Sequence, residues 1–339
     1  MATSHVYRAR NNGGSNIDKR DSMHTIVLAR YSEPLEWIAD IPADFKVIIY
    51  NKGEEITSPE VLARADEIVA RPNVGRESET YIHHMMTRAT DDRYFTVFSQ
   101  GDPMTHSPDF IDLLKNWRKW DDVQALSWQW LTARNIPPAA SLARYEEYFP
   151  LHLRVRPEPF SLMDWVALEF VDAGAWNMGL VFKTLEGMSP NTGNIAAHAL
   201  RKWKLDALAD QAEKHSVGVF SYGAIFAVRN EGVAKLPAES KELIYEFSVG
   251  AAAANGYILE RMWLHIFGTG FYRRVPFMDE HASALNLPGV SEAARADITN
   301  LVLSLVDHGM SMNDVSTFVQ ETMREQLSVL KSTGNETVS

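Results

Sequence analysis

The sequence predicts an α/β protein whose sheet is mostly parallel and flanked by helices. Four short apolar runs rich in valine, isoleucine and phenylalanine recur between residues 25 and 101, and segments of helical or turn character separate them. Such runs are typical of strands buried on both faces, and strands that alternate with helices indicate parallel pairing. With 339 residues, 45% of them hydrophobic and 23% charged, the chain is long enough to bury this core.

The first part of the chain alternates regularly between the two types of element. The predicted strands are TIVLAR (25–30), FKVIIY (45–50), EIVA (67–70) and YFTVF (94–98). The intervening segments are PLEWIAD (34–40), SPEVLARA (58–65) and ESETYIHHMMTRA (77–89). In the last of these, helical spacing places Glu77, Tyr81, His84 and Arg88 along one face.

The later part of the chain is predicted in less detail. Helices are expected at 108–120 and 195–214, a glycine-punctuated strand at 217–229, and helices near 233–254 and at 255–268. Residues 291–332 have the pattern of two amphipathic helices split at HGMSMND. We therefore expect a disordered segment at 1–22, a main domain at 23–280 with a largely helical insertion at 108–216, and a helical extension at 281–339.

The composition excludes several classes of protein. The chain has no cysteine, which rules out a disulfide framework and thiolate chemistry and fits a reducing compartment. A net charge of −11 argues against extensive nonspecific binding to nucleic acid, although a small phosphorylated ligand needs only one local basic or amide-rich pocket. No apolar run is long enough for a membrane span or a signal peptide, so the predicted location is the cytoplasm.

An unusual polar cluster follows each of the four predicted strands. The clusters are RYSE (30–33), NKG (51–53), NVGRE (73–77) and QGD (100–102). In an open parallel sheet the carboxyl ends of the strands lie at one edge, which is where ligands bind. Any one cluster alone is explained by ordinary turn chemistry, but four together favour a ligand of nucleotide size.

The residue types in these clusters suggest their roles. Glycine permits a close approach of the backbone, arginine and lysine meet phosphate charge, and asparagine suits a base or a ribose. Asp102 is a candidate ligand for a hard cation that bridges a diphosphate. The candidate ligand-binding residues are Arg30, Tyr31, Glu33, Asn51, Lys52, Gly53, Asn73, Gly75, Arg76, Glu77, Tyr81, Gln100, Gly101 and Asp102.

Common catalytic motifs do not occur. The chain has no phosphate loop of the Walker type, and no G-x-G-x-x-G follows the first predicted strand. It has neither G-x-S-x-G nor H-E-x-x-H. The usual ATPase, dinucleotide-binding, serine hydrolase and zinc protease interpretations therefore lose their main signal.

Six ordered motifs carry a resemblance to a known family. ARYSEPLEWI, VIIYNKG, NVGRESETYIHHM, VFSQGDPMTHSPDF, SYGAIFAV and GYILERMWLHIFG resemble domain-of-unknown-function family 3431 of bacteria and fungi. The resemblance covers roughly residues 25–110 and 217–268, with a diverged or inserted segment between them. The family name itself carries no activity.

A weaker resemblance to nucleotide-sugar glycosyltransferases of the GT-A type implies an activity. NVGRESETYIHHM looks like the Asn-x-Gly element of that fold, and VFSQGDP looks like its strand ending in Asp-x-Asp. The resemblance implies a GT-A-like, Rossmann-like catalytic domain that takes a sugar nucleotide as co-substrate and an unknown hydroxyl acceptor. Gln100 stands where the first aspartate belongs. Either Asp102 alone anchors Mg or Mn through the donor phosphates, or cationic side chains replace the metal.

The resemblance also implies a catalytic base on a helix behind the acceptor. Glu260 is the candidate, with Tyr257, Trp263 and Leu264 three or four positions away on the same helix. Apolar neighbours disfavour the charged carboxylate and raise its pKa toward the range useful for a general base. A structural ion pair with Arg261 or a more distant cation is the alternative role for Glu260.

The acceptor side is predicted from four further residues. Gly223 would let a polyol approach the strand, Tyr222 would offer a stacking face, and His106 would add a ligand or a phosphate contact. Adjacent helical residues point about 100° apart, so His83 and His84 seldom share one ion, and His84 is the one chosen for a substrate contact. For Tyr222 and Gly223 the alternative is a core strand with a bulge glycine.

Two other functions remain open at this point. The chain would be a noncatalytic carbohydrate- or nucleotide-binding module if the missing aspartate had abolished catalysis, or a nucleotidyl or phosphoryl transferase on a similar sheet. The C-terminal helices are expected to pack on the body of the protein or to form a homodimer.

Overall fold

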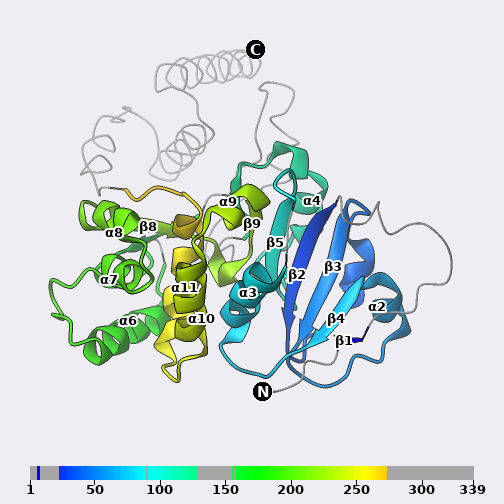
Figure 1. The fold of residues 1–339 in the computed structure, drawn as a ribbon, viewed down its shortest axis with the longest axis horizontal. Helices are drawn as coiled ribbons and strands as arrows, with labels where there is room; N and C mark the ends of the chain where they lie inside the picture. Colours follow the sequence, from blue (N-terminus) through cyan, green and yellow to red (C-terminus); the bar gives the residue numbers. More distant parts are fainter. Residues whose placement is uncertain are drawn as a thin grey trace, which may run out of the picture. The chain divides into compact units, whose positions relative to one another are not determined.

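A computed structural model describes residues 6–7, 23–88, 91–127, 155, 157–168 and 170–272. Its centre is a seven-stranded sheet with the strand order β1-β4-β3-β2-β5-β9-β6 (Figure 1). In chain order the strands are β1 (Val6–Tyr7), β2 (His24–Arg30), β3 (Phe45–Asn51), β4 (Glu67–Ala70), β5 (Phe95–Gln100), β6 (Val123–Ala125) and β9 (Phe226–Arg229).

The four predicted strands form the centre of this sheet and run parallel. β2 pairs with β3 on one side and β5 on the other, and β3 pairs with β4. Their valine, isoleucine and phenylalanine side chains are almost all buried, as expected of strands covered on both faces. β9 is antiparallel to β5, and β1 is antiparallel to β4. Because β2, β3, β4 and β5 all run parallel, the predicted α/β class with a mostly parallel sheet is confirmed.

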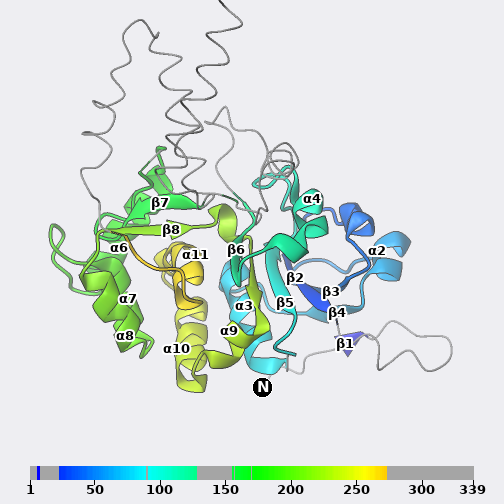
Figure 2. The ribbon, with the colours of Figure 1, turned by 90° about the horizontal axis from the view of Figure 1, so that it is seen from above.

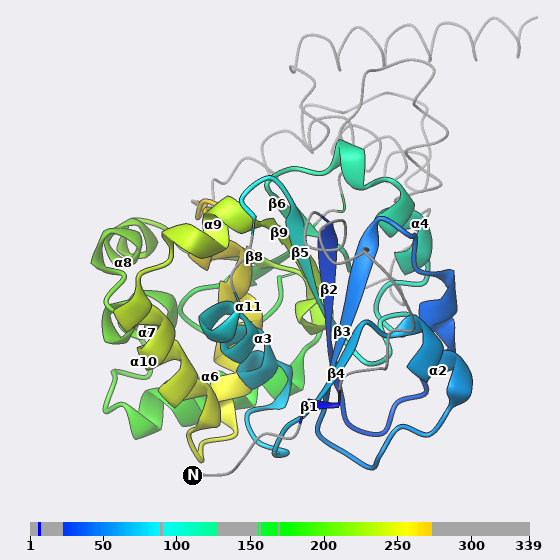
Figure 3. The same cartoon turned by 45° about the vertical axis from the view of Figure 1, so that its right-hand side comes forward.

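Helices cover both faces of the sheet (Figure 3). One face carries α3 (Arg76–Thr87), α10 (Ala238–Val249) and α11 (Ala254–Ile266). The other carries α2 (Pro59–Arg64) and α4 (Phe110–Lys115), with the 3-10 helix η1 (Glu36–Asp40) beside α2. The core therefore lies in two layers, and Phe98, Tyr81 and Trp263 belong to the layer beneath α3 and α11.

A smaller group of elements lies beside α11 (Figure 2). β7 (Glu158–Ser161) and β8 (Val217–Phe220) form a two-stranded antiparallel sheet. α6 (Ala173–Leu185), α7 (Ile195–Lys202) and α8 (Asp206–Glu213) complete the group, and α6 and β8 pack on α11. The described part of the predicted insertion at 108–216 therefore contains two short strands, β6 and β7, as well as helices.

The predicted single strand at 217–229 is wrong. It is two strands in two different sheets, β8 and β9, joined by the 3-10 turn η3 (Tyr222–Ala224). Gly223 has a φ of 70°, which breaks the extended backbone and turns the chain from one sheet into the other. An apolar run with an internal glycine gave no signal of which sheet each half would join.

Several predicted helices are shorter than expected. The helix at 195–214 divides into α7 and α8 near Lys204, whose φ of 59° ends the first helix. The helix near 233–254 divides into α9 (Asn230–Lys235) and α10 on either side of Pro237. The helix at 108–120 divides into α4 and the 3-10 helix η2 (Trp117–Lys119).

The two ends of the chain are described only in part. Val6–Tyr7, inside the segment expected to be disordered, form β1. The predicted amphipathic helices at 291–332 lie outside the described residues. Among the residues that the structure describes, no helix has both the length and the apolar character needed to cross a membrane.

Candidate functional site

The carboxyl ends of β2, β3, β4 and β5 meet at one edge of the sheet. Arg30 is opposite Asn51, Asn51 is opposite Ala70, and Ala29 is opposite Gln100. The chain leaves β2 on one side to form β3 and β4 and then returns to form β5 on the other side. The carboxyl ends of β2 and β5 are therefore a topological switch point, the place where open α/β sheets bind ligands.

The turns after β2 and β3 are fastened to each other. Arg30 Nη1 donates to Asn51 Oδ1 at 2.9 Å and to the Glu54 carbonyl at 2.8 Å, and Asn51 Nδ2 donates to the same carbonyl at 2.8 Å. A Cβ at Gly53 would lie 1.8 Å from the Tyr31 carbonyl oxygen, so only glycine fits there. Arg30, Asn51 and Gly53 thus shape the edge, while Tyr31 leaves 54% of its surface exposed above it.

The turns after β2 and β5 are joined in a similar way. Glu33 Oε2 accepts hydrogen bonds from the backbone N–H groups of Tyr31 at 2.7 Å and Ser32 at 3.0 Å. Trp37 Nε1 donates to the Gly101 carbonyl at 2.9 Å, and a Cβ at Gly101 would lie 2.9 Å from Glu33 Oε2. Gly101 is therefore a packing glycine that lets the Glu33 turn close against β5.

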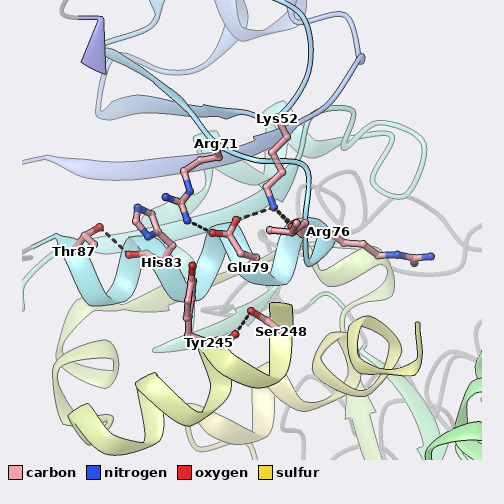
Figure 4. Close-up of polar contacts among 9 residues, drawn as sticks. Lys52, Arg71, Arg76, Glu79, His83, Thr87, Tyr245 and Ser248 are labelled. Carbon is pink, nitrogen blue, oxygen red and sulfur yellow. Dashed lines mark hydrogen bonds and ion pairs between the residues drawn. The ribbon is translucent and has the colours of Figure 1, made fainter. Parts of the chain in front are cut away.

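Lys52 does not serve as a phosphate ligand in this arrangement. Its ammonium donates to the carbonyls of Val74, at 2.7 Å, and Arg76, and lies 2.8 Å from Glu79 Oε2 (Figure 4). All three donors are engaged and the residue is only 8% exposed. The predicted contact with phosphate is corrected to a structural role, because the ammonium orders the turn between β4 and α3.

Glu79 is the centre of this buried cluster. It is completely buried and pairs with both Lys52 and Arg71 (Figure 4). Burial lowers the pKa of Lys52, and the neighbouring Glu79 carboxylate opposes that shift. The cluster joins the end of β3, the end of β4 and the first turns of α3, so it fixes where α3 begins.

Arg76, by contrast, is available to a ligand. It is exposed, it is the first residue of α3, and its guanidinium points away from the Glu79 cluster (Figure 4). The guanidinium lies over the ring of Tyr257, 5.0 Å from the centroid, and within the described part of the chain it has no carboxylate partner at ion-pair distance. Gly75 and Arg76 both have positive φ, 63° and 50°, which aims this side chain across the edge toward α11.

The predicted metal ligand Asp102 is already engaged locally. Its two carboxylate oxygens accept from the Met104 N–H at 3.2 Å and from Thr105 Oγ1 at 2.8 Å. No group of three histidine, aspartate or glutamate side chains suited to a metal occurs in the described ranges. Asn73 is exposed in the turn after β4.

Glu260 lies next to the edge, on α11. Gly223 N–H donates to Glu260 Oε1 at 2.9 Å, and Gln100 Nε2 donates to the Gly223 carbonyl at 2.7 Å. Tyr81, from α3, donates to the Ala224 carbonyl at 3.1 Å and is fully buried, so its predicted ligand contact is corrected to a core position. The end of β5, the η3 turn, α3 and α11 are thus linked through one glycine and its neighbour.

The electrostatic setting of Glu260 agrees with the expectation from its sequence. Burial raises the pKa of Glu260, while the Arg261 charge and the Gly223 N–H lower it. The side chain is half-buried, so its carboxylate is not sealed in the core. Arg261 is itself fully buried and pairs with Asp172 at 2.6 Å. The alternative pairing of Glu260 with Arg261 is therefore not the one that forms.

Glu77 is a second carboxylate with an altered proton affinity. Burial, assisted by the charge on Glu260, raises the pKa of Glu77 to about 7. The charges of Arg76 and Lys52 act in the opposite direction. The sequence placed Glu77 in a ligand-binding cluster but gave no sign of this shift, because burial and the charge on Glu260 both arise from packing between elements.

Tyr222 and His106 form the side of the site next to Gly223. Their rings meet edge to face, with centroids 4.8 Å apart, and both residues are half-buried. Burial lowers the pKa of His106, so the imidazole is neutral at neutral pH. Tyr222, Gly223 and His106 therefore lie together, and their contact with a substrate stays a prediction.

His84 does not reach the site. It is 2% exposed, and its Nδ1 lies 3.0 Å from the Tyr50 hydroxyl, in the core between α3 and β3. Burial lowers the pKa of His84 to about 3, so the ring is a neutral core residue. The predicted substrate contact is wrong because helical spacing put His84 on the face with Glu77 but two turns further from the edge.

The sequence analysis missed two residues near the site. Asp172 caps α6, accepting from the Ala175 N–H at 3.0 Å, and holds Arg261 with its other oxygen. Gly256 lets α3 approach α11, since a Cβ there would lie 3.2 Å from Arg76 Cδ. Asp172 lies outside the six motifs, and Gly256 opens GYILERMWLHIFG without any local sign of its role, so only the packing of α6 and α3 on α11 identifies them.

No protein-family model matches the chain, and no curated protein or solved structure matches it at a significant level. The resemblances to the domain-of-unknown-function family and to GT-A glycosyltransferases therefore stay predictions.

We predict that Glu79→Gln destabilises the protein severely. Removing the charge leaves Lys52 and Arg71 buried beside a neutral amide, and loss of one partner from a buried ion pair costs about 3–5 kcal/mol. Urea unfolding measures the change. Glu231→Gln, in an exposed pair with Lys235, is the control and should cost less than about 1 kcal/mol. Equal effects of the two substitutions would contradict a stabilising role for the cluster.

We predict that Gly223→Ala strains the centre of the site. The new Cβ would lie 2.5 Å from His106 Cδ2, in addition to the cost of about 1–3 kcal/mol for a strained backbone conformation. Gly187→Ala is a matched control, because Gly187 has a φ of 63° and no atom within 4 Å of its Cβ position. Urea unfolding should give the larger loss for Gly223→Ala. A loss no greater than that of the control would show that His106 yields freely.

Proposed function

We propose that this protein transfers a sugar from a nucleoside diphosphate donor to an acceptor hydroxyl. The observation that supports the proposal most is the meeting of the strand-end turns with Glu260 at one switch point, through the bonded series Gln100, Gly223 and Glu260. A donor held by the turns and an acceptor held beside Glu260 would then have their reacting atoms close together.

The donor is assigned to the turns after β2, β3 and β5. These turns are fixed by their own hydrogen bonds and by close glycine contacts, which gives a preformed surface. Tyr31 offers an exposed ring for a base, and Arg76, at the amino end of α3, offers a cation that pairs with no carboxylate among the described residues. The helix terminus and the guanidinium both favour the negative charge of a diphosphate.

The acceptor is assigned to the side formed by Tyr222, Gly223 and His106. The Glu260 carboxylate takes the proton from the acceptor hydroxyl, the oxygen forms a bond to the anomeric carbon, and the bond from that carbon to the diphosphate breaks. The nucleoside diphosphate leaves with the electron pair. A carboxylate whose pKa is raised is a stronger base than an ordinary glutamate, provided that it remains ionised.

The residues at hand fit a resident metal poorly. The oxygens of Asp102 accept local hydrogen bonds, and Gln100 donates to Gly223 instead of offering a free ligand. We therefore assign the stabilisation of the leaving diphosphate to Arg76. The alternative is Mg or Mn bound through Asp102 and the donor phosphates, and measuring donor binding with and without Mn tests it.

Sugar nucleotides should raise the thermal stability of the protein. A ligand that binds only the folded state adds RT ln(1 + [L]/Kd), which is about 4 kcal/mol at a thousandfold excess over Kd. A panel of sugar nucleotides, with and without Mn, measures the shift in melting temperature. No shift with any donor would contradict the proposal, and a shift with nucleoside triphosphates alone would favour nucleotidyl or phosphoryl transfer.

The substitution Arg76→Gln should weaken donor binding about tenfold or more, because a charge-assisted contact is worth about 1.5–3 kcal/mol. Arg118→Gln is the control, since Arg118 is exposed and pairs with Asp44 just before β3, at the opposite edge of the sheet. Calorimetric titration with the sugar nucleotide measures the donor affinity of both variants. Equal donor affinities would remove Arg76 from the site.

The substitution Glu260→Gln should abolish sugar transfer and leave donor affinity nearly unchanged. The amide keeps the shape of the carboxylate but cannot take a proton. Glu242→Gln, at an exposed position of α10, is the control and should keep full activity. Transfer is measured as release of the nucleoside diphosphate that depends on acceptor. Donor binding without transfer or hydrolysis by the wild type would identify a binding module instead.

A further inference from the structure

Two contacts bracket a second acidic residue opposite Glu260. The first turn of α3 meets the first turn of α11, where the Arg76 guanidinium covers the ring of Tyr257. Five residues further along α3 and six further along α11, the rings of Tyr81 and Trp263 lie 6.1 Å apart. The two helices therefore run side by side in the same direction at this point.

Glu77 and Glu260 lie on the stretches of α3 and α11 that these two contacts bracket. Glu77 lies between the contact residues of α3, four positions before Tyr81, and Glu260 lies between those of α11, three positions before Trp263. Both side chains are half-buried at the carboxyl edge of the sheet. The Gly223 N–H donates to one oxygen of Glu260, and the charge on Glu260 acts on Glu77.

We propose that Glu77 and Glu260 form one acid-base pair that holds a single proton near neutral pH. The inference rests on the proposed function for its catalytic meaning, though not for the pair itself. Two carboxylates facing each other in a partly buried site resist carrying two negative charges, so the second proton is released at a higher pH than the first.

Charged and titratable groups from several elements act on the pair. Arg76 and Lys52 face Glu77, and Lys52 is already engaged by Glu79. Arg261, Arg76 and Asp172 act on Glu260, and Arg261 is already engaged by Asp172. The charge on Glu260 also helps to raise the pKa of the Tyr81 and Tyr222 hydroxyls. Burial is the largest effect on both glutamates, and it exceeds the pull of these cations.

A pair with one proton suits transfer from an anionic donor. The ionised member, Glu260, takes the acceptor proton, while Glu77 keeps its own, so the site has one negative charge facing the diphosphate instead of two. After transfer both members are protonated, and one proton passes to water before the next turnover. Full ionisation at high pH would repel the donor, and full protonation at low pH would remove the base.

Titration of the carboxyl carbons tests the pair without any substrate. In protein labelled with 13C at the glutamate carboxyl, the Glu77 signal is identified by its loss in Glu77→Gln and followed from pH 4 to pH 9. We expect Glu77 to titrate near 7 in the wild type and at a lower pH in Glu260→Gln, because the neighbouring charge is gone. Glu242→Gln should leave it unchanged. An unchanged Glu77 titration in Glu260→Gln would overturn the proposal.

The stability of the protein against pH is the second readout. A carboxyl whose pKa is higher in the folded state than in the unfolded chain keeps its proton longer when folded, so stability falls as pH rises from about 4.3 toward 7. Glu77→Gln should remove much of this fall in melting temperature. If Glu77→Gln is unfolded at every pH, Glu77→Asp replaces it. The aspartate keeps a titrating carboxyl, so the variant's melting temperature should still fall as pH rises. The same decline in wild type and Glu77→Gln would argue against the pair.

The pH dependence of transfer adds the catalytic test. The wild type should be active over a bell-shaped range, and Glu77→Gln should keep the acidic limb and lose the alkaline one. Both limbs intact in Glu77→Gln would contradict a catalytic role for the pair. Absence of transfer with every donor would instead refute the proposed function, and the titration above would still decide whether the two glutamates share a proton.

Discussion

The buried carboxylate of Glu79 is the interaction on which the candidate site depends. It holds Lys52 at the end of β3 and Arg71 after β4, while the Lys52 ammonium also binds two carbonyls of the turn before α3. Because Glu79 and Lys52 are buried and the Arg71 side chain is only 10% exposed, loss of any of these three charges is costly. The start of α3 is thereby fixed, and with it the positions of Arg76 and Glu77.

The η3 turn is the second constraint, and it acts through the backbone. Gly223 offers its N–H to Glu260 and its carbonyl to Gln100, so one peptide segment joins the end of β5 to α11. The positive φ of Gly223 is what directs both groups inward. Tyr81 holds the next carbonyl from the side of α3. The strand-end turns and the helix with the candidate base therefore cannot move independently.

Much of the central sheet was predictable from the sequence, and the reasons are physical. Strands buried on both faces need uninterrupted apolar runs, so β2 to β5 were visible, and parallel pairing required their polar ends to share an edge. The exposure and the partners of individual polar residues were not predictable. Lys52 and Arg76 differ in exposure and partners. His84 and Tyr81 are both buried but bond to different elements, and such differences depend on packing between elements far apart in the chain.

The two glutamates illustrate the same limit and connect it to the chemistry. Glu260 had apolar neighbours on its own helix, so a raised pKa could be expected from local spacing. Glu77 follows an arginine at a polar helix start, where the helix terminus normally favours a charged carboxylate. Its pKa is raised nonetheless, because the fold buries it and α11 brings the negative charge of Glu260 to act on it. An acidic residue that is ordinary in sequence thus acquires a proton affinity near neutrality from the packing of two helices.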